Sequence, residues 1–194
     1  MSIATSRCTI RELQPGDRVR VEEMTRGAGL FSGSEISIAL EVFDDATGAN
    51  PAGTVDPDYE SAGVEVNGHL VGWAVWGPRP GEPATFDLYW IVVDPPWQRN
   101  GLGRILHDHM EERIEGRAEQ VLVETSGRPD YERTREFYER HGYRAFRRVA
   151  DFYGPGDDQV VYVRALSRAG LHPPLQGSMT GLARRVPSNR VPSS

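Results

Sequence analysis

The amino-acid sequence predicts an α/β protein with one central mixed β-sheet. Apolar runs and amphipathic periods follow one another along the chain in the order β, α, α, β, β, β, α, β, α, β, β. Strands alternate with helices only in the second half, which favours a mixed sheet over a wholly parallel one. The length of 194 residues fits a single domain that can bury a core without metal or disulfide cross-links.

The first three elements are a strand and two helices. Residues 8–13 are expected to form the strand, and Asp17 can cap a short helix that ends near Arg26. Ser32 and Glu35 have the spacing of a capping box, which predicts the start of a second helix. The apolar residues of that helix recur at positions i, i+3, i+4 and i+7, as Ile36, Ala39, Leu40 and Phe43.

A loop and a β-hairpin are expected next. Residues 45–62 are rich in Asp, Gly, Pro and Ala and predict an unusually long loop. The dipeptide Asn67-Gly68 is typical of a two-residue hairpin turn, here between strands at 64–66 and 70–76. The first half of the chain therefore contributes three strands and two helices.

The second half alternates strands with helices and closes with an antiparallel pair. The expected segments are a loop at 78–83, a strand at 85–93, a helix with Leu102, Ile105, Leu106, Met110 and Ile114 on one face, a strand at 121–125, a helix at 131–141, and strands at 143–153 and 159–166. Gly116 and Gly142 can end the two helices, because glycine readily adopts the left-handed conformation that follows a helix C-terminus. The turn at 154–158, GPGDD, joins the last two strands.

Composition excludes several classes of protein. Cys8 is the single cysteine, so the chain forms no internal disulfide and holds no Cys/His structural zinc site. His107 and His109 are two positions apart on a helix and face different directions, so no metal is expected. No apolar run approaches the roughly 18–20 residues of a membrane span. The N-terminus lacks the apolar stretch of a signal peptide, and a cytoplasmic location is expected.

Charge is distributed unevenly along the chain. Residues 1–166 hold 18 arginines and 28 acidic residues, whereas residues 167–194 hold four arginines and no acid. The acidic first part is expected to repel nucleic acid and to favour cationic small molecules. Residues 167–194 are dense in Pro, Gly and Ser and lack periodicity, so we expect a disordered tail after a domain of residues 1–166.

The strongest local signal lies at residues 97–104, WQRNGLGR, between a strand and a helix. The N-terminus of a helix presents unpaired N–H groups at its positive end, which suits an anion. Gly101 and Gly103 allow a ligand to approach the backbone, and Arg99 and Arg104 add positive charge. The segment is not a Walker A loop, because the required glycine spacing and lysine are absent.

Two segments together resemble the motifs of the GCN5-related N-acetyltransferase (GNAT) family. Residues 91–103, IVVDPPWQRNGLG, resemble its motif A, and residues 134–143, TREFYERHGY, resemble its motif B. The resemblance covers residues 8–166 and is greatest to the bacterial small-molecule type, which has a loop like that at 152–158. It implies a central, mostly antiparallel mixed sheet flanked by helices, and transfer of an acetyl group from acetyl-coenzyme A to an amine.

The resemblance also implies which residues bind the co-substrate. The pyrophosphate would lie against the turn after the strand, and the pantetheine arm would pair with the strand backbone as an added strand does. The N–H of Val93 could polarise the thioester carbonyl. The implied coenzyme A-binding residues are Ile91, Val92, Val93, Gln98, Arg99, Asn100, Gly101, Leu102, Gly103, Arg104, Arg135 and Tyr138.

Two residues are the main catalytic candidates. Tyr138 matches the family tyrosine that protonates the departing thiolate. Asp87 lies at the offset where histone-type members carry their general-base glutamate, since an ammonium group must lose a proton before it attacks. Glu124 at the end of the next strand, or a chain of water molecules, is the competing base.

The acceptor is expected to be a small-molecule amine. Aromatic and acidic side chains suit a cationic amine, and the candidates for an acceptor wall are Trp76, Tyr89, Trp90, Phe152, Asp157 and Asp158. The alternative function is a non-catalytic acyl-coenzyme A sensor on the same fold, because a fold does not fix a function. The closing strands could also supply a homodimer surface.

Overall fold

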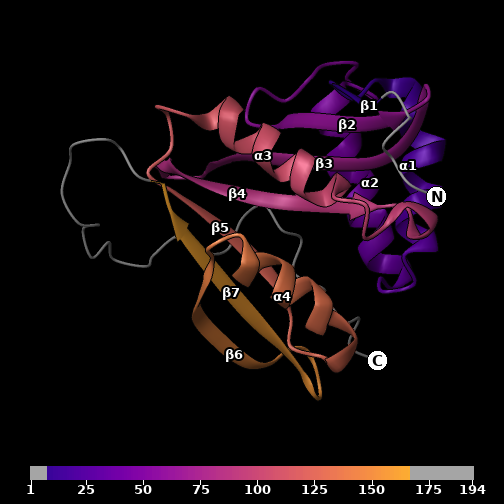
Figure 1. Cartoon of the computed structure of the whole chain (residues 1–194). Helices are drawn as coiled ribbons and strands as arrows, with labels where there is room; N and C mark the ends of the chain where they lie inside the picture. The colour runs from indigo at the N-terminus through magenta and orange to yellow at the C-terminus, as the bar shows by residue number, and fades with distance from the viewer. Residues whose placement is uncertain (1–7, 167–194) are drawn as a thin grey trace. The chain divides into compact units, whose positions relative to one another are not determined.

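The computed structural model describes residues 8–166, which form four α-helices and seven β-strands (Figure 1). The helices are α1 (Arg18–Gly27), α2 (Gly33–Thr47), α3 (Leu102–Ile114) and α4 (Glu132–Arg140). The strands are β1 (Cys8–Arg11), β2 (Glu60–Val66), β3 (His69–Arg79), β4 (Glu82–Val93), β5 (Gln120–Ser126), β6 (Arg144–Gly154) and β7 (Asp157–Ala165). The tail expected at 167–194 lies outside the described residues.

The strands pair in the order β1-β2-β3-β4-β5-β7-β6. The pairs β1–β2, β2–β3, β5–β7 and β6–β7 are antiparallel, whereas β4 and β5 are parallel. The mixed, mostly antiparallel sheet expected from the sequence is therefore confirmed. None of the helices within residues 8–166 has the length and hydropathy that crossing a bilayer requires.

The chain divides into two compact units. Unit 1 comprises Met1–Gly77 and Leu88–Glu115, and unit 2 comprises Pro78–Asp87 and Gly116–Ser194. Strand β4 contributes its first half to unit 2 and its second half to unit 1. The described parts of the two units each have their own apolar cluster.

Unit 1 buries the apolar faces of α1 and α2 against its strands. The fully buried side chains include Val21 and Met24 of α1, Phe43 of α2 and Trp73 of β3. The capping box expected at the start of α2 is present: the N–H of Glu35 donates to Ser32 Oγ, and the Ser32 N–H donates to the Glu35 carboxylate.

Asp17 does not cap α1 as the sequence suggested. Its carboxylate accepts hydrogen bonds from the Gln14 N–H at 2.8 Å and from the Arg11 guanidinium at 2.7 Å. No side-chain hydrogen bond caps α1 itself. The side chain therefore fixes the turn between β1 and α1, because its two oxygens are closer to the preceding residues than to the helix.

The structure shortens both expected loops. Helix α2 continues to Thr47 and β2 begins at Glu60, so the loop expected at 45–62 loses residues at both ends. Strand β3 extends to Arg79 and strand β4 begins at Glu82, so the loop expected at 78–83 is reduced to a tight turn. Pro78 and Pro83 lie within β3 and β4, because a strand near its end tolerates a residue that donates no backbone hydrogen bond.

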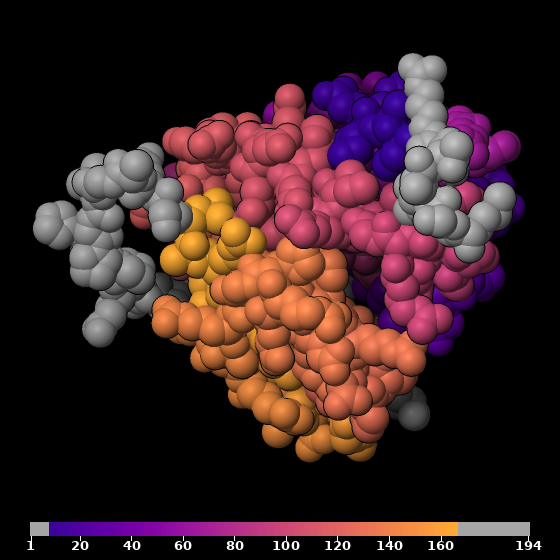
Figure 2. Space-filling model, in the orientation of Figure 1, coloured from indigo at the N-terminus to yellow at the C-terminus, as the bar shows by residue number. Residues whose placement is uncertain are grey.

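In unit 2, helix α4 packs on one face of the sheet through Tyr138. The Tyr138 ring lies 5.5 Å from the ring of Tyr143 and 6.2 Å from that of Tyr162 on β7. The opposite side of α4 is exposed, including Glu132 and Glu136, and forms part of the orange surface in Figure 2. The other face of this part of the sheet carries the apolar cluster Leu122, Val161 and Val163.

Gly77, at the end of unit 1, has no room for a side chain, because a Cβ there would overlap the backbone carbonyl of Asp58. We expect Gly77→Ala to lower the free energy of unfolding by about 1–3 kcal/mol, as overpacking in a close-packed interior does. Gly33→Ala is the matched control, since a Cβ at the first residue of α2 meets no atom within 4 Å. Urea unfolding measures the free energy of unfolding of both variants, and equal stability of the two would contradict the expectation.

Candidate active site

Helix α3 of unit 1 begins with an uncapped N-terminus. Its N-cap, Gly101, has a left-handed φ of 81°, and no side chain hydrogen-bonds to the cap. The first helical bond that follows runs from the Ile105 N–H to the Gly101 carbonyl at 3.0 Å. The N–H groups of residues 102–104 precede that bond and have no helical acceptor. A Cβ at Gly101 would meet no atom within 4 Å, so the space beside it is open.

The turn before α3 is held in shape by its own side chains. Gln98 Nε2 donates to the Val93 carbonyl at 3.0 Å, and Asn100 Nδ2 donates to the carbonyls of Trp97 and Gln98 at 3.2 Å. Arg99 is exposed and adopts a left-handed φ of 62°. The turn thus needs no ligand to keep its shape, and the N–H groups of residues 102–104 are available to an anion.

The second half of β4 leads into this turn, and its pairing with a pantetheine arm stays a prediction. Val92 is buried in the unit 1 core, whereas Ile91 and Val93 are half-buried. The Val93 carbonyl accepts the Gln98 bond and keeps one further acceptor site. Arg104 pairs with Asp108 at 3.2 Å on the exposed side of α3.

In unit 2 the two candidate bases, Asp87 and Glu124, pair with the same arginine. Arg79 Nη2 lies 2.7 Å from Asp87 Oδ1 and 3.7 Å from Glu124 Oε1. Asp87 is paired in register with Leu122, two residues before Glu124, so both carboxylates lie on the same face of the sheet. Arg79 was missed from the sequence because it fell in the expected loop at 78–83. A single arginine at the end of an otherwise apolar strand was the available signal.

Burial dominates the electrostatics of Asp87. The loss of solvent raises its pKa to about 6, although the Arg79 guanidinium opposes this and Glu124 adds to it. A carboxyl group with a pKa near the working pH is an effective general base. Asp87 therefore has the properties expected of a proton acceptor.

Tyr138 projects from α4 into the interior of unit 2. Burial raises the pKa of its hydroxyl well above the ordinary value, so the group is protonated throughout the neutral range. No described side chain or backbone group hydrogen-bonds to this hydroxyl. Tyr138 contacts Tyr162, whose neighbour Val161 is paired with Glu124. Because side chains alternate along a strand, Tyr138 and the Asp87 cluster lie on opposite faces of the sheet.

The side chain of Arg135 binds the turn between β5 and α4. Its Nη1 donates to the carbonyls of Ser126 and Arg128, both at 2.8 Å. Those bonds hold the loop in which α4 starts. A contact of Arg135 with coenzyme A stays a prediction, and it would use the remaining guanidinium nitrogens.

The aromatic residues considered for an acceptor wall do not share one environment. Trp76 is 1% exposed and contacts His109, whereas Phe152 is 47% exposed and contacts Tyr153. In unit 1, Trp90 stacks on Trp73 with ring centroids 6.1 Å apart. Asp157 and Asp158 bond to Ser126 and Arg148 in unit 2 and hold the β6–β7 turn.

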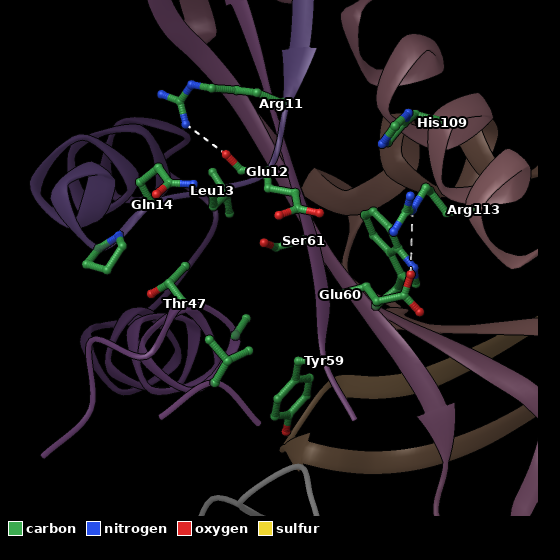
Figure 3. A pocket seen from close by; sticks show the side chains of 14 residues that line it. Arg11, Glu12, Leu13, Gln14, Thr47, Tyr59, Glu60, Ser61, His109 and Arg113 are labelled. Atoms are coloured by element: carbon green, nitrogen blue, oxygen red, sulfur yellow. Dashed lines mark hydrogen bonds and ion pairs between the residues drawn. The ribbon is translucent and has the colours of Figure 1, made fainter. Parts of the chain in front are cut away.

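Unit 1 contains a pocket of about 380 Å³ beside the first residues of β2 (Figure 3). Glu60 of β2 and Arg113 of α3 form an ion pair at 3.8 Å in this pocket, with His109 beside Arg113. Of the expected site residues only Trp76 lines it. The pocket contacts the C-terminal half of α3, so it is separate from the uncapped N-terminus of that helix.

Comparison with known proteins gives one family. Residues 32–143 match the model of the acetyltransferase (GNAT) family. A solved GNAT family structure from Desulfovibrio desulfuricans is 31% identical, with a TM-score of 0.73 over 82% of this chain and 99% of that chain. No curated protein sequence matches the chain significantly.

Two further structures show the same fold at lower identity. The ribosomal-protein-S18-alanine N-acetyltransferase of Escherichia coli is 20% identical, with a TM-score of 0.66 over 86% of this chain and 99% of that chain. The PaiA N-acetyltransferase of Thermoplasma acidophilum, solved with coenzyme A, is 15% identical, with a TM-score of 0.61 over 82% and 99%.

We expect ionisation of Asp87 to weaken the folded state. Its pKa lies above the ordinary 3.8, so the stability contributed by the neutral carboxyl is complete below about pH 4 and is lost as the pH rises through 6. Relative to Asp87→Asn, the unmodified protein should lose up to about 3 kcal/mol of unfolding free energy between about pH 4 and pH 7. Urea unfolding across this range measures the difference, and a difference that does not vary with pH would contradict the expectation.

Proposed function

The chain belongs to the acetyltransferase (GNAT) family and is an N-acetyltransferase, and we propose that it moves the acetyl group of acetyl-coenzyme A directly to the amine of a small-molecule acceptor. The observation that carries the proposal is the uncapped N-terminus of α3. Helix α2 closes its N-terminus with Ser32 and Glu35, whereas α3 leaves its N–H groups to a ligand. A pyrophosphate supplies the negative charge and the acceptor oxygens that these groups lack.

Unit 1 provides the proposed binding residues for the co-substrate. The N–H groups at the start of α3 bind the pyrophosphate, with Arg99 and Arg104 adding charge. The backbone of residues 91–93 pairs with the pantetheine arm. Gln98 and Asn100 keep the turn in the conformation that exposes these groups. Acetyl-coenzyme A supplies the acetyl group, activated as a thioester.

Unit 2 provides the proposed acid and base. Asp87 accepts a proton from the acceptor ammonium, and the neutral nitrogen then bonds to the acetyl carbon. The carbon–sulfur bond breaks with its electron pair on sulfur, and Tyr138 donates its proton to that thiolate. The nitrogen, positively charged once it has bonded to carbon, loses its second proton to water, and water returns a proton to Tyr138.

An amine panel tests the proposal directly. The purified protein is incubated with acetyl-coenzyme A and candidate polyamines, amino sugars, amino acids and peptides, and free thiol is measured. Amine-dependent thiol release together with an acetylated small molecule is the expected result. Release only with peptides or proteins would exclude the small-molecule acceptor, although it would leave the family assignment intact.

Gly101→Val should weaken coenzyme A binding by about 30-fold or more, equivalent to about 2 kcal/mol. A branched side chain is strained at φ 81° and projects into the open space beside the N–H groups. Gly116→Val is the matched control: it has φ 75°, no atom within 4 Å and lies beyond the other end of the same helix. Calorimetry with coenzyme A distinguishes them, and equal affinity of both variants would exclude the turn as the binding site.

Tyr138→Phe should lower kcat by about 10- to 1,000-fold while coenzyme A affinity is retained. The variant keeps the ring that packs against Tyr162 and removes the proton donor. Because the raised pKa keeps the hydroxyl protonated, the loss should be the same at every pH of the assay. Full kcat with the acceptor found in the panel would show that Tyr138 acts only in packing.

A further inference from the structure

Arg79 joins the two candidate bases of unit 2, and we propose that it is a positioning residue for the transfer reaction, binding Asp87 and Glu124 into one carboxylate pair that accepts a single proton from a monocationic amine. The inference rests on the proposed function, because it takes the ammonium proton to leave through this cluster. It assigns a role to Arg79 and distinguishes between Asp87 and Glu124 as the acceptor of the proton.

The geometry of the cluster is compact and largely shielded from solvent. One nitrogen, Arg79 Nη2, faces both carboxylates, at 2.7 Å from Asp87 and 3.7 Å from Glu124. The three side chains are 11%, 15% and 24% exposed, in the order Arg79, Asp87 and Glu124. An arginine that is this buried must be paired with acidic groups, because a lone buried charge is strongly unfavourable.

The hydrogen bonds separate the roles of the two carboxylates. Both oxygens of Glu124 have partners: Oε1 faces Arg79, and Oε2 accepts from Gln159 Nε2 at 2.7 Å. Asp87 Oδ1 accepts from Arg79, and Asp87 Oδ2 has no hydrogen-bond partner among residues 8–166. The free oxygen on Asp87 is therefore the atom that can take the proton, while Glu124 is held in place.

The charge of the cluster indicates the class of substrate. One guanidinium and two carboxylates leave a net charge of −1 when both acids are ionised. A single ammonium group neutralises that charge, and transfer of its proton to Asp87 leaves the cluster neutral. The pair therefore matches an acceptor that presents one cationic amine to the cluster.

The charged and polar groups around Asp87 and its partners lie on strands β3 to β7. Arg79 is on β3, Glu82 is on β4 with Asp87, and Glu124 is on β5. Gln159 on β7 binds Glu124, and Arg147 on β6 donates to Gln159 at 3.4 Å. Arg79 lowers the pKa of Asp87, whereas Glu124 and Glu82 raise it. Removing Arg79 or Glu124 must therefore move the titration of Asp87 in opposite directions.

The test is a titration of the Asp87 carboxyl carbon by NMR in protein labelled with ¹³C-aspartate, with Asp87→Asn assigning the signal. Arg79→Gln should raise the midpoint by about one pH unit or more, as expected for loss of a cation at hydrogen-bonding distance. Glu124→Gln should lower it, and Arg79→Lys should restore most of the Arg79→Gln shift. Arg148→Gln, which breaks an exposed pair elsewhere on β6, is the matched control and should change nothing.

The pH dependence of kcat/KM with the best amine of the panel is the second measurement. In the unmodified protein the rate should rise through about pH 6 and then level off, and the midpoint should follow the NMR shifts in each variant. If Arg79→Gln does not fold, Glu124→Gln and Arg79→Lys still give the sign of the shift. Midpoints that do not move, or that move in the same direction for Arg79→Gln and Glu124→Gln, overturn the positioning role.

Two outcomes separate this inference from the proposed function. An Asp87→Asn protein with full activity shows that Asp87 is not the base, which overturns both the proposed mechanism and this inference. If Asp87→Asn is inactive, but the NMR and kinetic midpoints of the protein that retains Asp87 do not respond to substitution of Arg79, only the inference is overturned. The NMR titration needs no acceptor, so it stands even if every amine in the panel is inactive.

Discussion

The backbone pairing of strand β4 is the constraint on which both units depend. A central strand must satisfy its N–H and C=O groups by pairing on both sides, and residues 85–87 of β4 do so with β5 in unit 2. That pairing places Asp87 in a poorly solvated position. The same strand continues into unit 1 and ends at the turn before α3. Its register therefore decides the environment of a carboxylate at one end and the position of an anion site at the other.

The burial of Asp87 explains why unit 2 needs Arg79. Loss of solvent raises the pKa of the carboxyl, and a cation at 2.7 Å limits that rise. Glu124 shares the same guanidinium, so neither acid is independent of the other. The result is a carboxyl group on β4 with a pKa of about 6, which suits a general base.

Helices α2 and α3 show how one fold treats two helix N-termini differently. Ser32 and Glu35 satisfy the N–H groups of α2 and contribute to stability. Helix α3 has a glycine at the same position and no acid in its first turn, so it forgoes this stabilisation. The side chains of Gln98 and Asn100 hold the turn instead. The open N-terminus thus fits the anion-binding role proposed for this turn.

The sequence alone was sufficient for the order of elements, the mixed sheet and the family, because apolar periodicity and glycine positions are local signals. It also located the turn at 97–104, whose chemistry lies in consecutive residues. It overextended the loop at 45–62, because strand pairing depends on residues distant in the sequence. It also assigned Asp17 the wrong partner, because the carboxylate binds Gln14 and Arg11 before it rather than the helix after it.

Only the tertiary structure joined Asp87, Glu124 and Arg79. These residues come from three strands and are separated by up to 45 positions. Their mutual distances, burial and pKa values arise from strand register and from the exclusion of water, neither of which a linear pattern contains.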